Sequence, residues 1–202
     1  MKKKIYDTIY HEHLDYHTFS PLYKCLKDVG FNLFNVDIVD SQGGSLRIYC
    51  QKSKLYTENK NRIKKLINNE NKILNEKQLL KWTTASTFYK NKIRKEIFTT
   101  HKLGGKVYGY GAPTKTVLTC KLLDLDINDV YQIIEDNSLK VGKFVPKYGI
   151  PIVSKTKYEI NCNDLILCFA WNFIDNILIN LRKKFGSKIK VMSVQNGKVF
   201  LT

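Results

Sequence analysis

The sequence predicts an α/β protein in which a helix, an antiparallel strand pair and long helices precede a Rossmann-like domain with a parallel sheet. Strand-like and helix-like segments alternate through the second half, which is typical of a parallel sheet wrapped by helices. In the first half, two alternating segments flank a glycine turn, and a long stretch without Pro or Gly follows. We therefore divide the chain into residues 1–55, a helical connector at 56–103 and an α/β domain at 104–202.

The first predicted helix follows the amino-terminal motif, in "FSPLYKCLKDVG". Ser20 is the expected N-cap, Pro21 lies in the first turn and Gly30 ends the helix. Its apolar residues have helical spacing: Leu22, Cys25, Leu26 and Val29. The segments "FNLFNVDIV" and "SLRIYCQ" on either side of "DSQGG" then alternate as an antiparallel strand pair does.

The connector predicts two helices. The first carries Ile63, Leu66 and Ile67 on one face, and the second begins near Asn75. After "LGG" the expected strands are "KVYGY", "DVYQIIEDN", "IPIVS", "DLILCFAW", "KIKVMSV" and "KVFLT". The expected helices between them are "TKTVLTCKLLDL" and "NFIDNILINLRKKFG".

Charge and cysteine usage restrict the function classes. With 34 Lys and Arg against 18 Asp and Glu, the formal net charge is +16, which fits nucleic acid or a small phosphate-bearing ligand. The lysines are dispersed among Asn and Ile, which argues against nucleic acid as the main partner. No apolar run approaches 18 residues, so we expect no membrane segment.

The five cysteines do not form a metal-binding or disulfide pattern. Their number is odd and no CxxC occurs, which predicts a reducing, cytoplasmic compartment and no zinc ligand set. Cys120 and Cys168 lie within apolar runs, where buried free thiols are expected.

The stretch "VYGYGAPTK" is the first candidate binding element. Gly109 and Gly111 place a turn between a strand and a helix, and Lys115 adds a positive charge suited to a phosphate. Asp136 lies 25 residues after Gly111 (136 − 111), near where a ribose-binding acid stands in dinucleotide sites. Thr114 replaces the third glycine, so the turn either contacts a ligand, including a nicotinamide or adenosyl cofactor, or serves conformation alone.

Two other stretches have a functional and a structural interpretation. In "SQGGSLRIY", Gly44 and Arg47 could approach a ligand, although a hairpin with a left-handed glycine explains the pattern better. In "FAWNF", Trp171 and Asn172 follow a predicted strand at the edge where open α/β sheets bind ligands. Asn172 could equally be the N-cap of the next helix.

The motif Tyr10-His11-Glu12-His13 concentrates polar chemistry near the amino end. Three of the four histidines fall within seven residues there, but no third residue has metal-ligand spacing. Glu12 beside His13 suits proton transfer, and the Tyr10 hydroxyl could polarise a carbonyl or enolate oxygen. A polar loop before the helix is the alternative.

Five segments in this order resemble a known family: "IYHEHLDY", "GGSLRIY", "GYGAPTK", "EDNSLKVGKFVPKYGIPI" and "AWNFIDNI". The chain is similar to the S-adenosylmethionine-dependent C-methyltransferases that act on nucleotide-linked deoxysugars. The resemblance implies a dTDP-4-keto-deoxysugar substrate that is deprotonated and methylated at C3. It places Tyr10, Glu12 and His13 at the reacting centre, with His13 as the base, and implies that residues 104–202 bind the nucleotide sugar, with Lys115 and the glycine turn near its phosphates.

The same resemblance implies a zinc-binding domain and a cofactor-binding domain before these motifs, and we find neither before Tyr10. Residues 1–55 would then be the tail of a methyltransferase sheet, and S-adenosylmethionine would be held by a separate half. We expect a truncated or split enzyme whose strand pair packs on the helices, pairs with another copy or completes a cofactor-binding chain. The alternatives are a non-catalytic nucleotide-sugar-binding module and a basic nucleic-acid-binding protein.

Overall fold

The computed structural model describes residues 10, 12–40, 44–53, 55–156, 159–186 and 189–201. The chain divides into two compact units: of the described residues, 12–83 belong to the first unit, and Tyr10 together with residues 84–201 belongs to the second. The fold is α/β, as predicted, with a two-stranded antiparallel sheet in the first unit and a six-stranded, mostly parallel sheet in the second.

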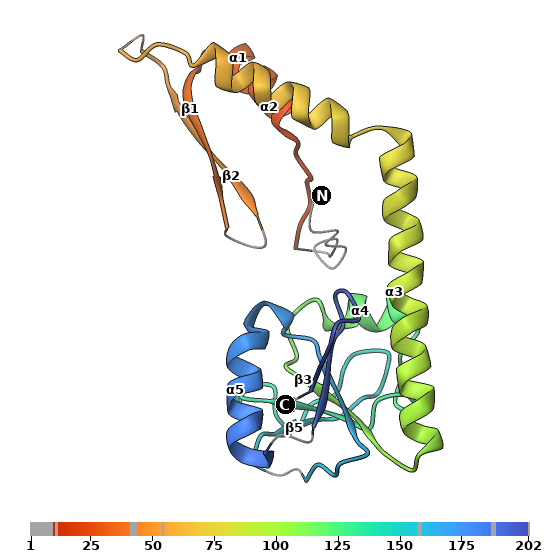
Figure 1. The fold of residues 1–202 in the computed structure, drawn as a ribbon. Coiled ribbons are helices and arrows are strands. Elements are labelled where there is room, and N and C mark those ends of the chain that lie inside the picture. Colours follow the sequence, from red (N-terminus) through yellow and green to blue (C-terminus); the bar gives the residue numbers. More distant parts are fainter. Residues whose placement is uncertain are drawn as a thin grey trace. The chain divides into compact units, whose positions relative to one another are not determined.

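The first unit is built from two helices and a strand pair, shown in Figure 1. In chain order these elements are α1 (Phe19–Asp28), β1 (Asn32–Val39), β2 (Ser45–Gln51) and α2 (Lys60–Ile73). The strands are antiparallel, with Asn32 opposite Gln51 and Val39 opposite Ser45, and a bulge lies between Leu33 and Asn35. The predicted helix and antiparallel strand pair are thus confirmed.

The ends of α1 show one error in the prediction. Thr18, not Ser20, occupies the N-cap position. The Ser20 backbone N–H instead donates to both carboxylate oxygens of Glu70 in α2, at 3.1 and 3.3 Å. Gly30 follows the helix with φ of +84°, and its N–H donates to the Lys27 carbonyl, as expected of a glycine that ends a helix.

A small apolar core holds the first unit together. Phe19 of α1, Leu33 and Val36 of β1 and Ile63 of α2 are buried against one another. The strand pair therefore packs on the helices, which was one of the three arrangements expected for it. Two strands alone are marginal in water, so this helix packing is what stabilises the pair.

The two helices predicted after the strand pair are present. Asn59 caps α2 by accepting the Arg62 backbone N–H at 3.1 Å. The second helix, α3 (Glu76–Lys102), crosses the boundary between the two units. Its carboxyl-terminal half buries Ile93 and Ile97 in the core of the second unit.

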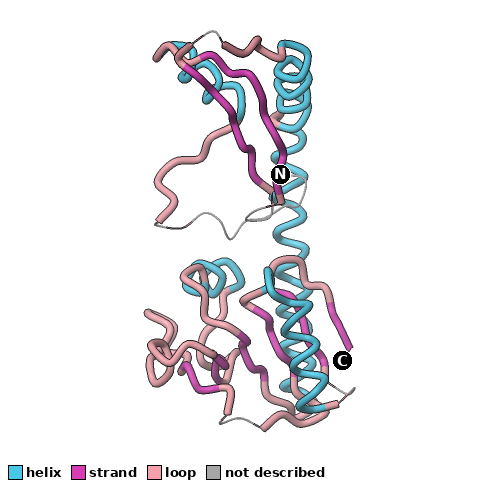
Figure 2. The backbone as a smooth tube through the Cα atoms, turned by 90° about the vertical axis from the view of Figure 1, so that its left-hand side faces the viewer, coloured by secondary structure: helices cyan, strands magenta, loops and turns pink. Residues whose placement is uncertain are grey.

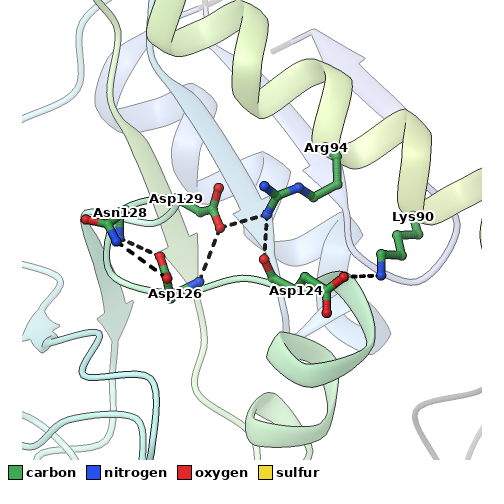
Figure 3. Close-up of polar contacts among 6 residues, drawn as sticks. All are labelled: Lys90, Arg94, Asp124, Asp126, Asn128 and Asp129. Carbon is green, nitrogen blue, oxygen red and sulfur yellow. Dashed lines mark hydrogen bonds and ion pairs between the residues drawn. The ribbon is translucent and has the colours of Figure 1, made fainter.

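Polar contacts also fix this half of α3 to the loop after α4 (Figure 3). Arg94 donates to the Asp129 carboxylate at 2.7 Å and to the Asp124 carbonyl, and Lys90 pairs with the Asp124 carboxylate. Asp129 also accepts the Asp126 backbone N–H at 3.3 Å, so that helix and loop share one polar network.

The sheet of the second unit has the strand order β5-β4-β3-β6-β7-β8. All neighbouring strands are parallel except β8, which runs antiparallel to β7 at the edge of the sheet. Figure 2 draws the strands as magenta tubes. The strands are β3 (Val107–Tyr110), β4 (Gln132–Glu135), β5 (Ile152–Ser154), β6 (Leu165–Cys168), β7 (Lys190–Ser193) and β8 (Val199–Leu201). The helices between them are α4 (Thr116–Leu123), the 3-10 helix η2 (Trp171–Phe173) and α5 (Ile174–Phe185).

Helices cover both faces of this sheet (Figure 1). Alternate residues of β6 face opposite sides: Leu165 and Leu167 pack in the cluster that includes α3 and α4, whereas Ile166 and Cys168 pack in the cluster with α5. Every residue of β3 and β6 is buried, which is the burial expected of central parallel strands. The predicted Rossmann-like arrangement is confirmed.

Cys120 and Cys168 are free and fully buried, as predicted. Burial raises the pKa of each thiol to about 12. Among the helices of the described residues, none is both long and apolar enough to cross a bilayer.

Candidate functional site

The strand order creates a topological switch point between β3 and β6. From β3 the chain proceeds to β4 and β5 on one side, whereas from β6 it proceeds to β7 on the other side. Ligand sites of open α/β sheets lie at the carboxyl ends of the two strands that flank such a point. Four of the predicted site residues lie in the segments that follow these two strands: Gly111, Lys115, Trp171 and Asn172.

Both glycines of the turn have structural reasons to be glycine. A Cβ on Gly109, within β3, would lie 2.7 Å from Ile133 Cγ1 and 3.0 Å from Phe169 Cε2. Gly111 has φ of +78°, and a Cβ there would lie 2.5 Å from the Cβ of Ala170. Close packing and backbone conformation therefore account for both glycines without a ligand.

The backbone groups of the turn are bonded within the protein. The Gly111 N–H donates to the Ile134 carbonyl at 2.8 Å. The Ala112 N–H donates to Glu135 Oε2 at 2.6 Å, and the Ala112 carbonyl accepts from Lys140 Nζ at 2.8 Å. Glu135 and Lys140, which the sequence did not indicate as site residues, thus hold the turn through the N–H and the carbonyl of Ala112.

Glu135 is the last residue of β4 and its carboxylate is half-buried. Its other oxygen, Oε1, accepts the backbone N–H groups of Asp136 at 2.9 Å and Asn137 at 3.0 Å. Partial burial acts to raise the pKa of this carboxyl. The three backbone N–H groups and the nearby Lys140 ammonium outweigh burial, so the Glu135 pKa lies below its ordinary value.

Asp136, the predicted ribose-binding acid, lies one residue beyond the strand. Its side chain is 53% exposed, and its carboxylate pairs with Lys155 Nζ at 3.5 Å. The residue whose carboxylate reaches the glycine turn is Glu135, the neighbour of Asp136, whereas the ribose-binding role of Asp136 stays a prediction.

Lys115 and Trp171 come together across the switch point. Lys115 occupies the N-cap position of α4, and its Nζ lies 4.6 Å from the centroid of the Trp171 ring. Such a cation–π contact holds the ammonium beside an aromatic face. Asn172 is exposed within η2, and the N-cap of α5 is Phe173 rather than Asn172.

Two other predicted residues, Gly44 and Arg47, lie on the strand pair of the first unit. Gly44 precedes β2 with φ of +126°, as the hairpin interpretation requires. Arg47 is exposed and stands opposite Asp37, which pairs with Arg62 of α2 at 3.1 Å. A separate hollow in this unit is lined by Ile38, Arg62, Lys65, Leu66 and Asn69.

The proposed acid–base residues precede α1. Glu12 and His13 are exposed and Tyr10 is half-buried, whereas His11 lies outside the described residues. The His13 ring stands edge-on to Tyr16 with centroids 6.4 Å apart. His13 belongs to the first unit and Lys115 to the second. Within the described part of the chain, no three His, Cys, Asp or Glu residues form a group that could hold a metal ion.

The glycine turn does not fit an adenosyl or nicotinamide cofactor. Such a cofactor needs N–H groups at the turn and an acid for its ribose. The N–H groups of Gly111 and Ala112 are already bonded, and Asp136 pairs with Lys155 at the surface.

Two comparisons with known proteins agree with each other. The family model "C-methyltransferase C-terminal domain" matches residues 40–192. The curated "C-methyltransferase NovU" of Streptomyces niveus is 26% identical over 182 residues, which are 89% of this chain and 43% of that protein. The chain thus spans less than half the length of this curated relative.

Proposed function

Because this chain belongs to the family of C-methyltransferase C-terminal domains, we propose that it is the nucleotide-sugar-binding part of a sugar C-methyltransferase. Its substrate would be a dTDP-4-keto-deoxysugar, deprotonated at C3 and methylated there. S-adenosylmethionine, held by a separate half, would supply the methyl group.

The family match is the observation that carries this proposal, and the switch point supports it. Lys115, beside Trp171 at the carboxyl edge of β3 and β6, offers a positive charge for the diphosphate and an aromatic face for a base or sugar. Asn172, on the same short segment as Trp171, offers an amide for a sugar hydroxyl. Gly44 and Arg47 are further candidate substrate contacts from the strand pair.

Deprotonation at C3 is assigned to the motif before α1. A carbon acid beside a ketone needs a base and stabilisation of the developing enolate oxygen. His13 would accept the C3 proton, Glu12 would orient its imidazole, and the Tyr10 hydroxyl would donate to the oxygen at C4. His13 is exposed, so the reacting centre would form when substrate or the cofactor-binding half covers it.

Calorimetry with dTDP-glucose tests the binding site. We expect Lys115→Met to weaken binding by about tenfold, because one charge-assisted phosphate contact is lost. Lys121→Met, which removes the same charge from an exposed position of the same helix, is the matched control and should leave binding unchanged. Equal effects of the two substitutions would refute a specific role for Lys115.

Deuterium wash-in at C3 of a dTDP-4-keto-sugar tests the base without any methyl donor. Exchange that is lost in His13→Ala and retained in His17→Ala, an exposed histidine four residues away, would support His13 as the base. Methyl transfer should then require addition of a cofactor-binding chain with S-adenosylmethionine. Full activity of the lone chain would contradict a split enzyme.

A non-catalytic nucleotide-sugar-binding module is the second candidate. The poor fit of the glycine turn to a cofactor favours it. Binding of dTDP-glucose without C3 exchange would support this candidate. Binding of DNA with a steep salt dependence and no response to dTDP-glucose would instead support a nucleic-acid-binding protein.

A further inference from the structure

We propose that Glu135 acts as a built-in anion that fills the glycine turn and excludes the pyrophosphate of dinucleotide cofactors from the second unit. In dinucleotide-binding folds the turn after the first strand presents free N–H groups to a pyrophosphate. In this chain a carboxylate of the protein takes that place, so the turn is closed to external phosphates.

The geometry around Glu135 carries the proposal. One carboxylate oxygen accepts the Ala112 N–H of the turn at 2.6 Å, and the other accepts two N–H groups beyond β4, at 2.9 and 3.0 Å. A carboxylate has about four lone-pair sites, so three backbone donors nearly saturate it. These charge-assisted bonds tie the ends of β3 and β4 together.

Lys140 completes the closure from the other side of the turn. Its ammonium donates to the Ala112 carbonyl at 2.8 Å, so both backbone groups of this residue are bonded to charged side chains. The Gly111 N–H is taken by the Ile134 carbonyl. A phosphate that enters the turn would have to displace the Glu135 carboxylate. If it did not, the two negative charges would repel each other.

This closure has a consequence for the nucleotide sugar, which rests on the proposed function. The diphosphate cannot use the N–H groups of Gly111 and Ala112, so its anchor at the switch point is the Lys115 ammonium. The second unit would accordingly select nucleotide sugars held by side chains over cofactors held by a glycine-rich backbone.

The experiment compares binding of inorganic pyrophosphate by calorimetry in three chains. Glu135→Ala removes the internal anion and frees three N–H groups, so its affinity should rise at least tenfold over the wild type. Glu159→Ala removes an exposed carboxylate from the same unit and should match the wild type. No gain in Glu135→Ala, or an equal gain in Glu159→Ala, would overturn the proposal.

A second measurement uses the wild-type chain and does not depend on folding of a variant. The amide proton resonance of Ala112 should shift as pH falls through the lowered pKa of Glu135. Besides Lys140, the titratable groups near this carboxylate are Asp136 and Tyr110, and burial raises the Tyr110 pKa to about 12, outside the acid range. Addition of dTDP-glucose or pyrophosphate at pH 7 should not reproduce the shift of the Ala112 resonance that protonation of Glu135 causes.

A ligand-induced shift of Ala112 equal to that of Glu135 protonation would mean that phosphate enters the turn, which would overturn the proposal. The two proposals fail separately. Absence of dTDP-glucose binding would refute the proposed function, whereas the pyrophosphate comparison still decides the role of Glu135.

Discussion

The two units differ in how completely their strands are buried. In the second unit every residue of β3 and β6 is buried, and helices cover both faces of a six-stranded sheet. In the first unit no residue of β2 is fully buried, and the buried core consists of Phe19, Leu33, Val36 and Ile63. One unit has the core of an independent domain, whereas the other depends on a few contacts between a strand pair and two helices.

This difference bears on where precise chemistry can take place. Lys115 and Trp171 are held at the ends of fully buried strands, so their positions are set by a rigid scaffold. Glu12 and His13 are exposed on a segment before α1. We infer that the second unit offers a preformed binding surface, whereas the residues proposed for proton transfer need further contacts to be fixed.

The largest expected effect comes from removing one core side chain from each unit. Leu167→Ala and Ile63→Ala should each cost about 2–5 kcal/mol, because each leaves a cavity in a buried cluster. We expect the second unit to remain folded with a lower midpoint, whereas the first unit should unfold. Hydrogen exchange measured segment by segment distinguishes these outcomes.

The same measurement tests whether the units are independent. In Ile63→Ala, amides of β1 and β2 should lose protection while those of β3 and β6 retain it. Loss of protection in both units would show a single cooperative fold and would break the comparison.

A pair of glycine substitutions separates packing from backbone strain in the second unit. Gly111 and Gly142 both have positive φ, +78° and +82°, but a Cβ meets Ala170 at 2.5 Å only in the first case. Gly142→Ala should cost about 1–2 kcal/mol from the left-handed conformation alone. Gly111→Ala should cost about 1–3 kcal/mol more, since the added methyl overpacks the switch point.

Thermal unfolding of the two variants measures the difference. Binding of dTDP-glucose is then compared between Gly111→Ala and Lys115→Met. Lys115→Met leaves the packed glycine in place, so it shows the loss of binding that occurs without a distorted turn. Equal destabilisation by the two glycine substitutions would mean that the contact with Ala170 relaxes at no cost.

The sequence predicted the order of helices and strands well because each is encoded locally. The alternation of strand and helix patterns and the absence of Pro and Gly from α2 and α3 are visible in the chain itself. The N-cap of α1 was predicted wrongly, at Ser20: the helix begins at Phe19, and the Ser20 N–H in its first turn is bound by Glu70, 50 residues away. No local pattern contains such a contact.

Glu135 shows the same limit within the candidate site. Counting residues from the glycine turn pointed to Asp136 as a ribose-binding acid and did not indicate that Glu135 faces the turn, which alternation along β4 decides. Glu135 lies two residues after Ile133, on the face that contacts Gly109, and Ile133 and Ala112 belong to the same core cluster. The burial of Ile133 against a strand far away in the sequence sets this orientation, so residue spacing alone could not choose between neighbouring acids.

A smaller effect is expected where α3 joins the second unit. Arg94→Met removes donors to the Asp129 carboxylate and the Asp124 carbonyl while keeping an apolar stem, and should cost about 1–2 kcal/mol. Lys90→Met, which breaks only the exposed pair with Asp124, should cost less. Urea unfolding followed by Trp fluorescence checks both, and a larger effect of Lys90→Met would contradict the network in Figure 3.

The smallest effect concerns the thiols. Cys120 and Cys168 are fully buried in the second unit, whereas Cys25 in the first unit and Cys162 in the second are exposed. Burial raises the pKa of Cys120 and Cys168 from 9.0 to about 12, so the folded state disfavours the thiolate. A raised folded-state pKa stabilises fully below the unfolded value and is lost as pH rises through the folded value. The free energy of unfolding should therefore fall between pH 9 and pH 12, and less in Cys120→Ala once its cavity cost at pH 7 is subtracted.

At pH 8, a thiol reagent should modify Cys25 and Cys162 rapidly and should reach Cys120 and Cys168 only at the rate of unfolding. Rapid modification of all four thiols would show that the second unit opens as readily as the first, against the contrast in burial between them.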